Sequence, residues 1–122
     1  DAEAAQERHL LASLPAAALR ADLLKLGHHG SRTSSTVPFL DAVRPRVAVV
    51  SVGRGNRYGH PSPSVLAELA ARRVPVFRTD VSGTLLVRSD GHTLTVSHAA
   101  GAWSLSSRIP AVVASGGAPS GR

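Results

Sequence analysis

Apolar residues occur in short runs along most of the chain, and polar segments rich in glycine or proline separate these runs. Residues 47–52 (VAVVSV) are almost continuously apolar and β-branched, which is typical of a strand buried on both faces of a sheet. Shorter apolar runs at 22–27 and 74–78 predict two further strands. Residues 84–88 and 93–97 flank an Asp-Gly turn signal and predict a β-hairpin.

Three helices are predicted between and before these strands. Residues 3–13 contain good helix formers without glycine or proline, and Pro15 ends this segment. Residues 34–43 begin with hydroxyl side chains suited to an N-cap, and residues 62–73 begin with Ser-Pro. We expect a turn over 79–83. Five short strands and three helices in this alternating order indicate an α/β layered fold.

The composition changes after His98, where glycine, alanine, serine and proline dominate. We therefore expect one domain over residues 1–98 and a flexible tail over 99–122, in which 109–113 is the apolar patch. The length of 122 residues suits a single domain. Because only 3% of residues are aromatic, the core must be built from alanine, valine and leucine.

The formal net charge is +6, and the basic residues cluster in the middle of the chain. Against Asp41 alone, the segment 25–60 holds Lys25, Arg32, Arg44, Arg46, Arg54 and Arg57. Such a cluster suits a polyanion, for example a phosphodiester backbone. The alternative is that arginine and alanine are abundant throughout the chain because of a GC-rich genome.

The chain has no cysteine, which excludes disulfides and thiolate metal sites. Any metal must be held by histidine and carboxylate. No apolar run approaches the length of a membrane span and no signal peptide is visible, so we expect the chain itself to be soluble. Because it begins at Asp1 and not at methionine, we expect a processed or excised piece of a longer protein.

His28-His29-Gly30-Ser31 follows the predicted strand 22–27 directly. Residues at the end of a strand in an α/β fold are held by the strand and exposed by the loop, which is where such folds carry chemistry. Neutral imidazole is the commonest metal ligand among side chains. The alternative is a pair of surface histidines in a turn.

Residues 53–61 form a second candidate, a glycine-rich loop after the buried strand 47–52. The loop carries Asn56, Tyr58 and His60, which we predict to be catalytic or substrate-facing. Tyr58 could stack on a base, and His60 could serve as general acid for a leaving oxygen. The alternative is structural: asparagine and glycine shape the turn, and His-Pro begins a helix.

The runs DLLKLGHHGSRTSST at 22–36 and RVAVVSVGRGNRYGHP at 46–61, followed by Arg-Thr-Asp at 78–80 and by Gly83, carry a resemblance. Together they closely resemble the C-terminal half of the metallo-β-lactamase-like domain of ComEC-type DNA internalization (competence) proteins. The resemblance covers about residues 1–97. It implies that residues 1–98 are a partial domain of this type, the C-terminal half of an αββα sandwich.

The resemblance also implies metal ligands. Asp1 stands where the family has a carboxylate that can bridge two metals, and one of His28 and His29 would be the last ligand of the domain. Of the two, we favour His28. The metal would be manganese or zinc, with two ions in the complete domain and none required in this piece. Gly30 would let the backbone pass close to metal or phosphate.

The side chains expected to contact substrate are Ser31, Arg32, Arg54 and Arg57. For Ser31 two functions stay open, since its hydroxyl could donate to a phosphate oxygen or cap the loop. The partner expected from the family and from the basic residues is DNA, in particular single-stranded DNA.

The chain departs from the family pattern because it lacks three parts of full ComEC proteins. These are the His-rich motif on an earlier loop, the strands of the N-terminal half and the membrane channel segments. The parent protein would be a bacterial membrane protein, and this chain would pair with the missing half-domain and the channel. An isolated chain would expose a sheet and could self-associate.

Three functions follow. The chain could be part of a metal-dependent phosphodiesterase or nuclease serving DNA uptake, inactive alone because ligands are missing. It could instead be a basic module that binds DNA without cutting it, or an inert truncated fragment.

Overall fold

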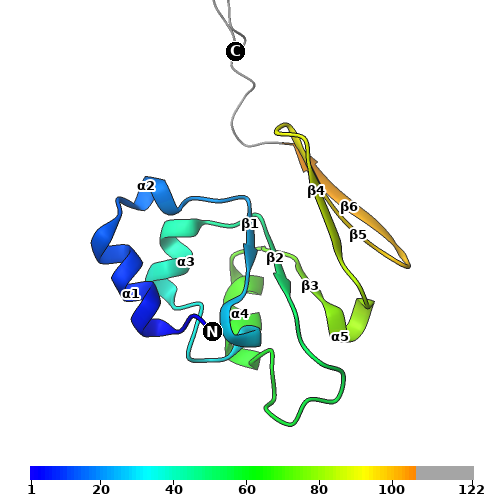
Figure 1. Ribbon diagram of the computed structural model, residues 1–122, viewed down its shortest axis with the longest axis horizontal. Coiled ribbons are helices and arrows are strands. Elements are labelled where there is room, and N and C mark those ends of the chain that lie inside the picture. The colour runs from blue at the N-terminus through cyan, green and yellow to red at the C-terminus, as the bar shows by residue number, and fades with distance from the viewer. Residues whose placement is uncertain (107–122) are drawn as a thin grey trace, which may run out of the picture. The chain divides into compact units, whose positions relative to one another are not determined.

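The computed structural model describes residues 1–106. Within it the chain forms two compact units, a first unit from Asp1 to Leu85 and a second unit from Leu86 onward, and each is described by itself (Figure 1). The first unit holds helices α1 (Ala4–Ser13), α2 (Ala16–Leu19), α3 (Val37–Val43), α4 (Pro63–Ala71) and α5 (Thr79–Ser82), and the short 3-10 turn η1 (Gly27–Gly30). Its strands are β1 (Leu23–Lys25), β2 (Val47–Val50) and β3 (Val76–Arg78).

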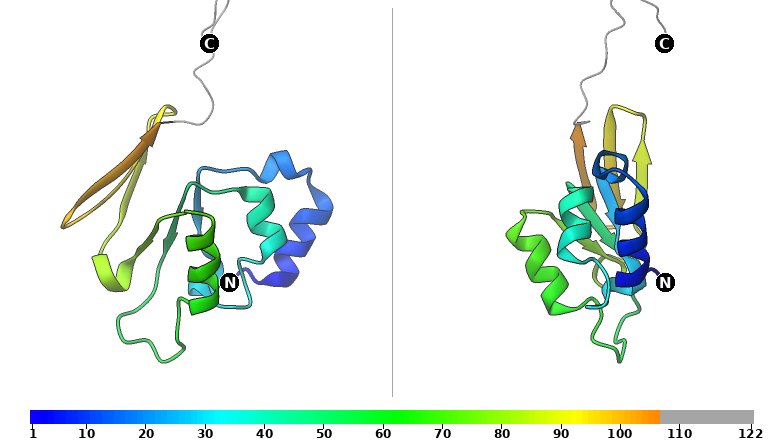
Figure 2. Two further views of the ribbon diagram at one scale, coloured as in Figure 1. Left: turned by 180° about the vertical axis from the view of Figure 1, so that it is seen from behind. Right: turned by 90° about the vertical axis from the view of Figure 1, so that its left-hand side faces the viewer.

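These three strands form a parallel sheet in the order β1-β2-β3. Leu24 pairs with Ala48, and Ala48 pairs with Val76. Parallel neighbours need a crossover connection, which α3 supplies between β1 and β2, and α4 between β2 and β3. Both helices can be followed beside the sheet in Figures 1 and 2. The carboxyl ends of all three strands therefore lie at one edge of the sheet.

A small aliphatic core joins the sheet to these two helices. Ala48 and Val50, two positions apart on β2, lie in one cluster with Leu40 of α3 and with Val65 and Leu69 of α4. Leu40 and Leu69 are completely buried. The core cluster of this unit consists of alanine, valine and leucine, as predicted. This core holds the ends of β1 and β2 in place.

The described part of the second unit is an antiparallel three-stranded sheet of β4 (Leu86–Ser89), β5 (Thr93–His98) and β6 (Gly101–Ser106). The hairpin predicted from the sequence is confirmed as β4 and β5. Its turn is fixed by Asp90, whose carboxylate accepts the amides of His92 and Thr93 at 2.8 and 2.6 Å. The Thr93 amide, followed by the His92 amide, holds the pKa of the Asp90 carboxyl below its ordinary value.

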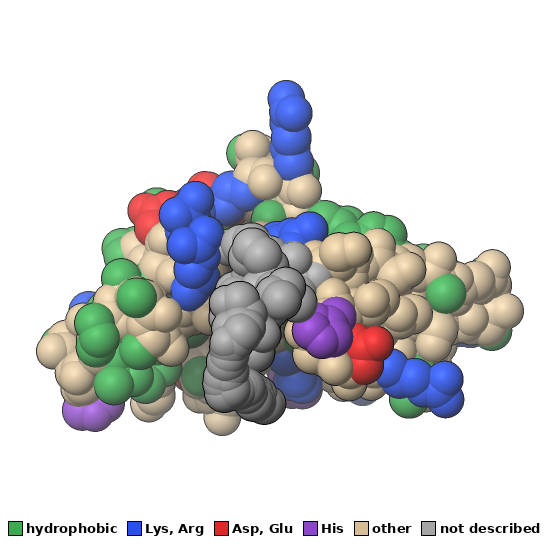
Figure 3. Space-filling model, turned by 90° about the horizontal axis from the view of Figure 1, so that it is seen from above, with side chains coloured by type: hydrophobic (Ala, Val, Ile, Leu, Met, Phe, Trp, Pro, Cys, Tyr) green, Lys and Arg blue, Asp and Glu red, His purple; other side chains and the backbone are tan. Residues whose placement is uncertain are grey.

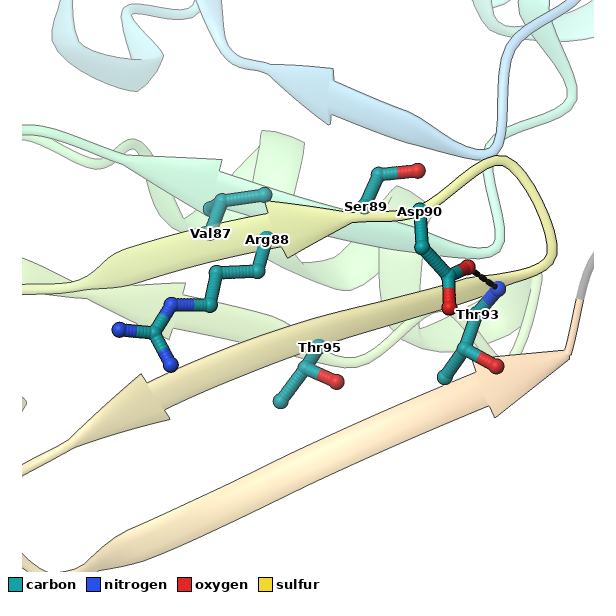
Figure 4. Close-up of a pocket in the computed structure, with 6 residues that line it drawn as sticks. All are labelled: Val87, Arg88, Ser89, Asp90, Thr93 and Thr95. Carbon is teal, nitrogen blue, oxygen red and sulfur yellow. Dashed lines mark hydrogen bonds between the residues drawn. The ribbon is translucent and has the colours of Figure 1, made fainter.

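An open hollow of about 570 Å³ lies on one face of this hairpin (Figure 4). It is lined by Val87, Arg88, Ser89, Asp90, Thr93 and Thr95. Its lining mixes short hydroxyl side chains and two charged residues with apolar surface. None of the residues that the sequence analysis proposed for the site lines it.

The α/β class predicted from the sequence is confirmed, whereas the predicted number of elements is too low: residues 1–106 contain six strands and five α-helices. The tail assignment is wrong for 101–106, which form β6. Trp103 pairs with Val96 and Leu105 with Leu94, so alternate apolar side chains extend the sheet. The remainder of the expected tail, with the patch at 109–113, lies outside the described residues. The sandwich of the metallo-β-lactamase type stays a prediction.

Residues 79–82 form the short helix α5 where a turn was expected. Thr79, the first residue of this helix, binds the segment after β2. Its hydroxyl donates to the Val52 carbonyl at 2.9 Å and accepts the Val52 amide at 2.8 Å. The end of β3 is thereby tied to the segment after β2. Arg78 binds both carboxylate oxygens of Asp80, at 3.0 and 2.8 Å, and this pairing holds the pKa of the Asp80 carboxyl below its ordinary value.

No helix within residues 1–106 combines the length and the apolar character that crossing a membrane requires.

Candidate functional site

His28 and His29 lie in η1, immediately after the carboxyl end of β1. Both have positive φ angles, 48° and 55°, a left-handed conformation that is uncommon for residues other than glycine. Two neighbouring residues in this conformation turn the backbone sharply at the strand end. Ser35, Arg44 and Arg73 also have positive φ angles, so the conformation alone does not mark a site, and the chemistry of this turn stays a prediction.

Two carboxylates lie beside these histidines. Asp1 Oδ2 is 3.8 Å from His28 Nε2 and 3.9 Å from His29 Nε2, so the predicted carboxylate and both predicted imidazoles converge. Glu3 Oε2 lies 3.5 Å from His28 Nδ1. That nitrogen is buried and has no hydrogen-bond partner in the described structure, because 3.5 Å is too long for a well-formed bond. The Glu3 carboxylate therefore lies beside this nitrogen without forming a hydrogen bond to it.

Glu3 was missed by the sequence analysis. Its side chain accepts the Gln6 backbone amide in a capping box at the start of α1. In return, the Glu3 backbone amide donates to Gln6 Oε1 at 3.0 Å. A glutamate three positions before a glutamine reads only as a helix start. The signal that could have revealed it is its separation of two residues from Asp1.

The ring of His29 is oriented by the segment that follows β2. Its Nδ1 lies 2.8 Å from the Ser51 carbonyl oxygen. A carbonyl only accepts, so Nδ1 carries the hydrogen and, in the neutral ring, Nε2 keeps its lone pair. This nitrogen is the one near Asp1. An imidazole whose second nitrogen donates to a backbone carbonyl is the usual arrangement of a metal ligand, which favours His29 over His28, the residue preferred from the sequence.

His60 joins the cluster from the β2–α4 loop, which projects from the first unit in Figure 1. Its ring centroid is 5.8 Å from that of His28. On its other side it stacks with Tyr58, at 5.8 Å between centroids and 21° between the ring planes. Two loops that follow neighbouring strands thus bring together residues about 30 positions apart in the sequence, as expected for the carboxyl edge of a parallel sheet.

Asn56 holds the shape of this loop. Its Nδ2 donates to the carbonyls of Gly53 and His60 at 3.2 and 2.8 Å, and its Oδ1 accepts the amides of Tyr58 and His60 at 3.2 and 3.0 Å. The amide thereby makes four hydrogen bonds within the loop. This geometry suits the positioning of His60 and Tyr58, and a direct catalytic role for Asn56 stays a prediction.

The expected substrate-binding residues fall into two groups. Ser31 is buried, and its hydroxyl bonds to the Thr33 hydroxyl at 2.9 Å and accepts the Thr33 amide at 3.2 Å, which are the contacts of a loop cap. Arg32, Arg54 and Arg57 are exposed. Basic side chains also project elsewhere, as Figure 3 shows on the face that it views. The position of basic side chains therefore does not by itself locate a binding site.

Gly30 brings the two loops into contact. Its φ is +77°, and a Cβ at this position would lie 2.6 Å from Pro61 Cβ and 3.0 Å from Pro61 Cα. The Gly30 carbonyl also accepts the Ser62 amide at 2.8 Å. Only glycine allows both the left-handed conformation and this close approach. The histidine turn and the start of α4 are held together at this point.

We expect Gly30→Ala to lower the free energy of unfolding by about 2–3 kcal/mol, because it adds a steric overlap to the cost of positive φ. Gly55→Ala is the matched control: Gly55 has a φ of +68°, but nothing lies within 4 Å of the place that a methyl group would take there. It should cost about 1 kcal/mol. Urea denaturation measures both, and equal losses would contradict the proposed contact with Pro61.

Glu7 is a buried anchor that the sequence analysis missed. Its carboxylate accepts the Ser35 amide at 2.6 Å, the Thr36 amide at 2.9 Å and the Thr36 hydroxyl at 2.7 Å, and only 3% of its surface is exposed. Thr36 is the N-cap of α3 and makes no side-chain cap bond of its own, so a glutamate from α1 satisfies these donors. With the bond from the Ala4 amide to the Thr33 carbonyl at 2.8 Å, this contact fixes the start of the chain near η1.

The residues present do not make a complete metal site. Within residues 1–106, no group of three histidine or acidic side chains is arranged to hold an ion. Asp1 and the histidines supply donor atoms of the right kind, but at the observed spacing they are too few. Asp80 does not complete the set, because both of its carboxylate oxygens are bound by Arg78. We therefore derive no catalytic step through a metal.

Several curated proteins resemble this chain, and three of them are competence or recombination proteins. It is 40% identical to ComE operon protein 3 of Bacillus subtilis over 79 residues, which is 65% of the chain. It is 48% identical to competence protein ComA of Neisseria gonorrhoeae over 67 residues, 55% of the chain. It is 40% identical to recombination protein 2 of Haemophilus influenzae over 87 residues, 71% of the chain.

In each case the match covers 10% of the relative, so the chain spans about a tenth of the length of these proteins. No protein-family model matches the chain. No solved structure matches it either. Over the matched part, the chain is homologous to a segment of these competence-related, ComEC-type proteins.

Proposed function

We propose that this chain is the histidine-bearing part of a metal-dependent phosphodiesterase or nuclease domain that acts on DNA during competence. The observation that carries the proposal is the convergence of Asp1, His28, His29 and His60 at the ends of β1 and β2. The relatives support the association with DNA, since one is named for competence and another for recombination. The proposal extends what those names say to this chain.

The roles proposed for the residues follow from their contacts. Asp1 and His29 are the best-placed donors for a divalent ion, because the Ser51 carbonyl fixes the tautomer of His29. His60 lies between two aromatic rings and could hold a proton for a leaving oxygen. The remaining ligands of a manganese or zinc site would come from outside the described residues.

The second candidate function is DNA binding without cleavage. It is favoured by the incomplete donor set within residues 1–106 and by the exposed arginines Arg32, Arg54 and Arg57, which lie in the two loop segments that carry the histidines. These side chains need no metal to attract phosphate. The inert fragment remains the third alternative, and a binding measurement separates it from the other two.

The isolated 122-residue chain is expected to bind single-stranded DNA weakly and to cleave none of it in the presence of manganese. Phosphodiester cleavage in two-metal sites needs a water activated on one ion and a leaving oxygen stabilised by another, and the described residues do not assemble the ligands for this. Binding should weaken steeply as salt rises, because it rests on phosphate contacts. Filter binding at several salt concentrations and a gel assay for cleavage measure the two outcomes.

The control for this experiment is the chain with both His28→Ala and His29→Ala. Cleavage by the unchanged chain, lost in the control, would contradict the incomplete site and indicate that the chain completes its site by dimerising. Absence of DNA binding at low salt would favour the inert fragment over both other functions.

A further inference from the structure

Tyr58 is an exposed aromatic residue held in a fixed place. It exposes 81% of its surface, whereas Phe39, Phe77 and Trp103 are half-buried. Its backbone amide donates to Asn56 Oδ1 at 3.2 Å, and one face of its ring stacks on His60. The ring is therefore oriented before any ligand arrives, which lowers the entropy cost of binding to its open face.

The charge around this ring selects the kind of ligand. Arg54 and Arg57 precede Tyr58 in the same loop and are exposed, and residues 53–61 contain no acidic side chain. An open aromatic face in a loop that also carries two exposed arginines suits a ligand that combines a planar ring with negative charge. Nucleotides in a polynucleotide strand have both, since the base stacks and the phosphates contact arginine.

The stack also points toward the histidine cluster. Tyr58 stacks on His60, and His60 lies 5.8 Å from His28. A strand whose base rests on Tyr58 would have its backbone within a short distance of the carboxylate and imidazoles near Asp1. Tyr58 would thus set which phosphodiester lies at the site.

We propose that Tyr58 is a stacking platform for one unpaired nucleobase, with Arg54 and Arg57 contacting the adjacent phosphates. This rests on the proposed function and narrows its substrate to unpaired strands. Bases in a duplex are stacked on their neighbours, so their faces are not available to a side chain without unstacking. The platform therefore discriminates single strands from duplex.

The test uses the 122-residue chain in EDTA with a short single-stranded oligonucleotide that contains one 2-aminopurine, a base whose fluorescence is quenched by stacking. We expect saturable quenching, and a loss of affinity of about 5- to 100-fold in Tyr58→Ala, as for other base-stacking aromatics. Tyr58→Trp should retain both affinity and quenching. The duplex form of the oligonucleotide should bind more weakly and show no dependence on Tyr58.

Two further variants separate stacking from charge. Arg57→Gln should weaken binding and reduce the slope of affinity against salt by about 0.7, while quenching at saturation stays the same. Val81→Ala, which truncates another exposed apolar side chain (69% exposed) outside the loop, should change nothing. Circular dichroism of each variant checks that it is folded.

The outcomes are distinct. Unchanged affinity and quenching in Tyr58→Ala, or equal dependence on Tyr58 for duplex, would overturn the platform and leave DNA contact by the basic residues intact. No binding of either nucleic acid would overturn both the platform and DNA contact by this chain. Tyr58-dependent quenching without hydrolysis by the complete protein would support the platform and overturn the hydrolase.

Discussion

Replacing both His28 and His29 with alanine in the complete protein is expected to abolish metal-dependent DNA hydrolysis. Both imidazoles lie within 4 Å of Asp1, at 3.8 and 3.9 Å, so the double variant removes both of the imidazoles that approach this carboxylate. Loss of a group that merely orients a ligand already costs about 10- to 100-fold. We therefore expect a loss of at least about 10²-fold in the rate of cleavage, measured on labelled single-stranded DNA.

The single variants rank the two histidines. His29→Ala should cost more than His28→Ala, because His29 is the one whose second nitrogen is held by a backbone carbonyl. His92→Ala is a matched control, since this exposed histidine lies in the β4–β5 turn. It should leave hydrolysis unchanged. Hydrolysis retained by the double variant would remove these histidines from the reaction altogether.

Replacing Glu7 with alanine is expected to cost about 3–5 kcal/mol of the free energy of unfolding. The change removes three hydrogen bonds to a buried carboxylate and leaves the amides of Ser35 and Thr36 without a partner at the start of α3. Hydrogen bonds to charged groups contribute about 1.5–3 kcal/mol each, and a buried unsatisfied donor costs about 1–3 kcal/mol. Partial access of water to Thr36 keeps the total below the sum.

Glu68→Ala is the control for Glu7. Glu68 is also a helical glutamate, and it bonds Arg72 at 2.8 Å on the surface. A surface pair of this kind contributes less than about 1 kcal/mol. Urea denaturation of the 122-residue chain gives both values. A loss below about 1 kcal/mol for Glu7→Ala would mean that water or another group satisfies the start of α3 equally well.

The elements that the sequence predicted best are those with a strong local cause. The β-branched run at 47–52 became β2, the segment 3–13 became α1, and Asp-Gly at 90–91 became the turn of the hairpin. Each depends on neighbours in the sequence. Strand β6 was missed because glycine, alanine and serine dominate its segment, and its pairing with β5 outweighs that weak preference.

In the candidate site, too, the features with a local cause could be predicted, and those that depend on distant residues could not. Placing the histidines at a strand end and His60 in the next loop required only the order of strands and helices. Choosing between His28 and His29 required the direction of a ring toward Ser51, which no sequence pattern encodes. The burial of Glu7 could not be predicted from its helix, because the donors that bind its carboxylate lie 28 and 29 residues away.

The hydrogen bonds of Asn56 hold the backbone of the 53–60 loop without the help of its exposed side chains. The side chains of Arg54, Arg57 and Tyr58 contribute none of these hydrogen bonds. Substitutions at these three positions can therefore change the affinity for a ligand while the backbone of the loop keeps its conformation. A library randomised at these positions should yield mostly folded proteins.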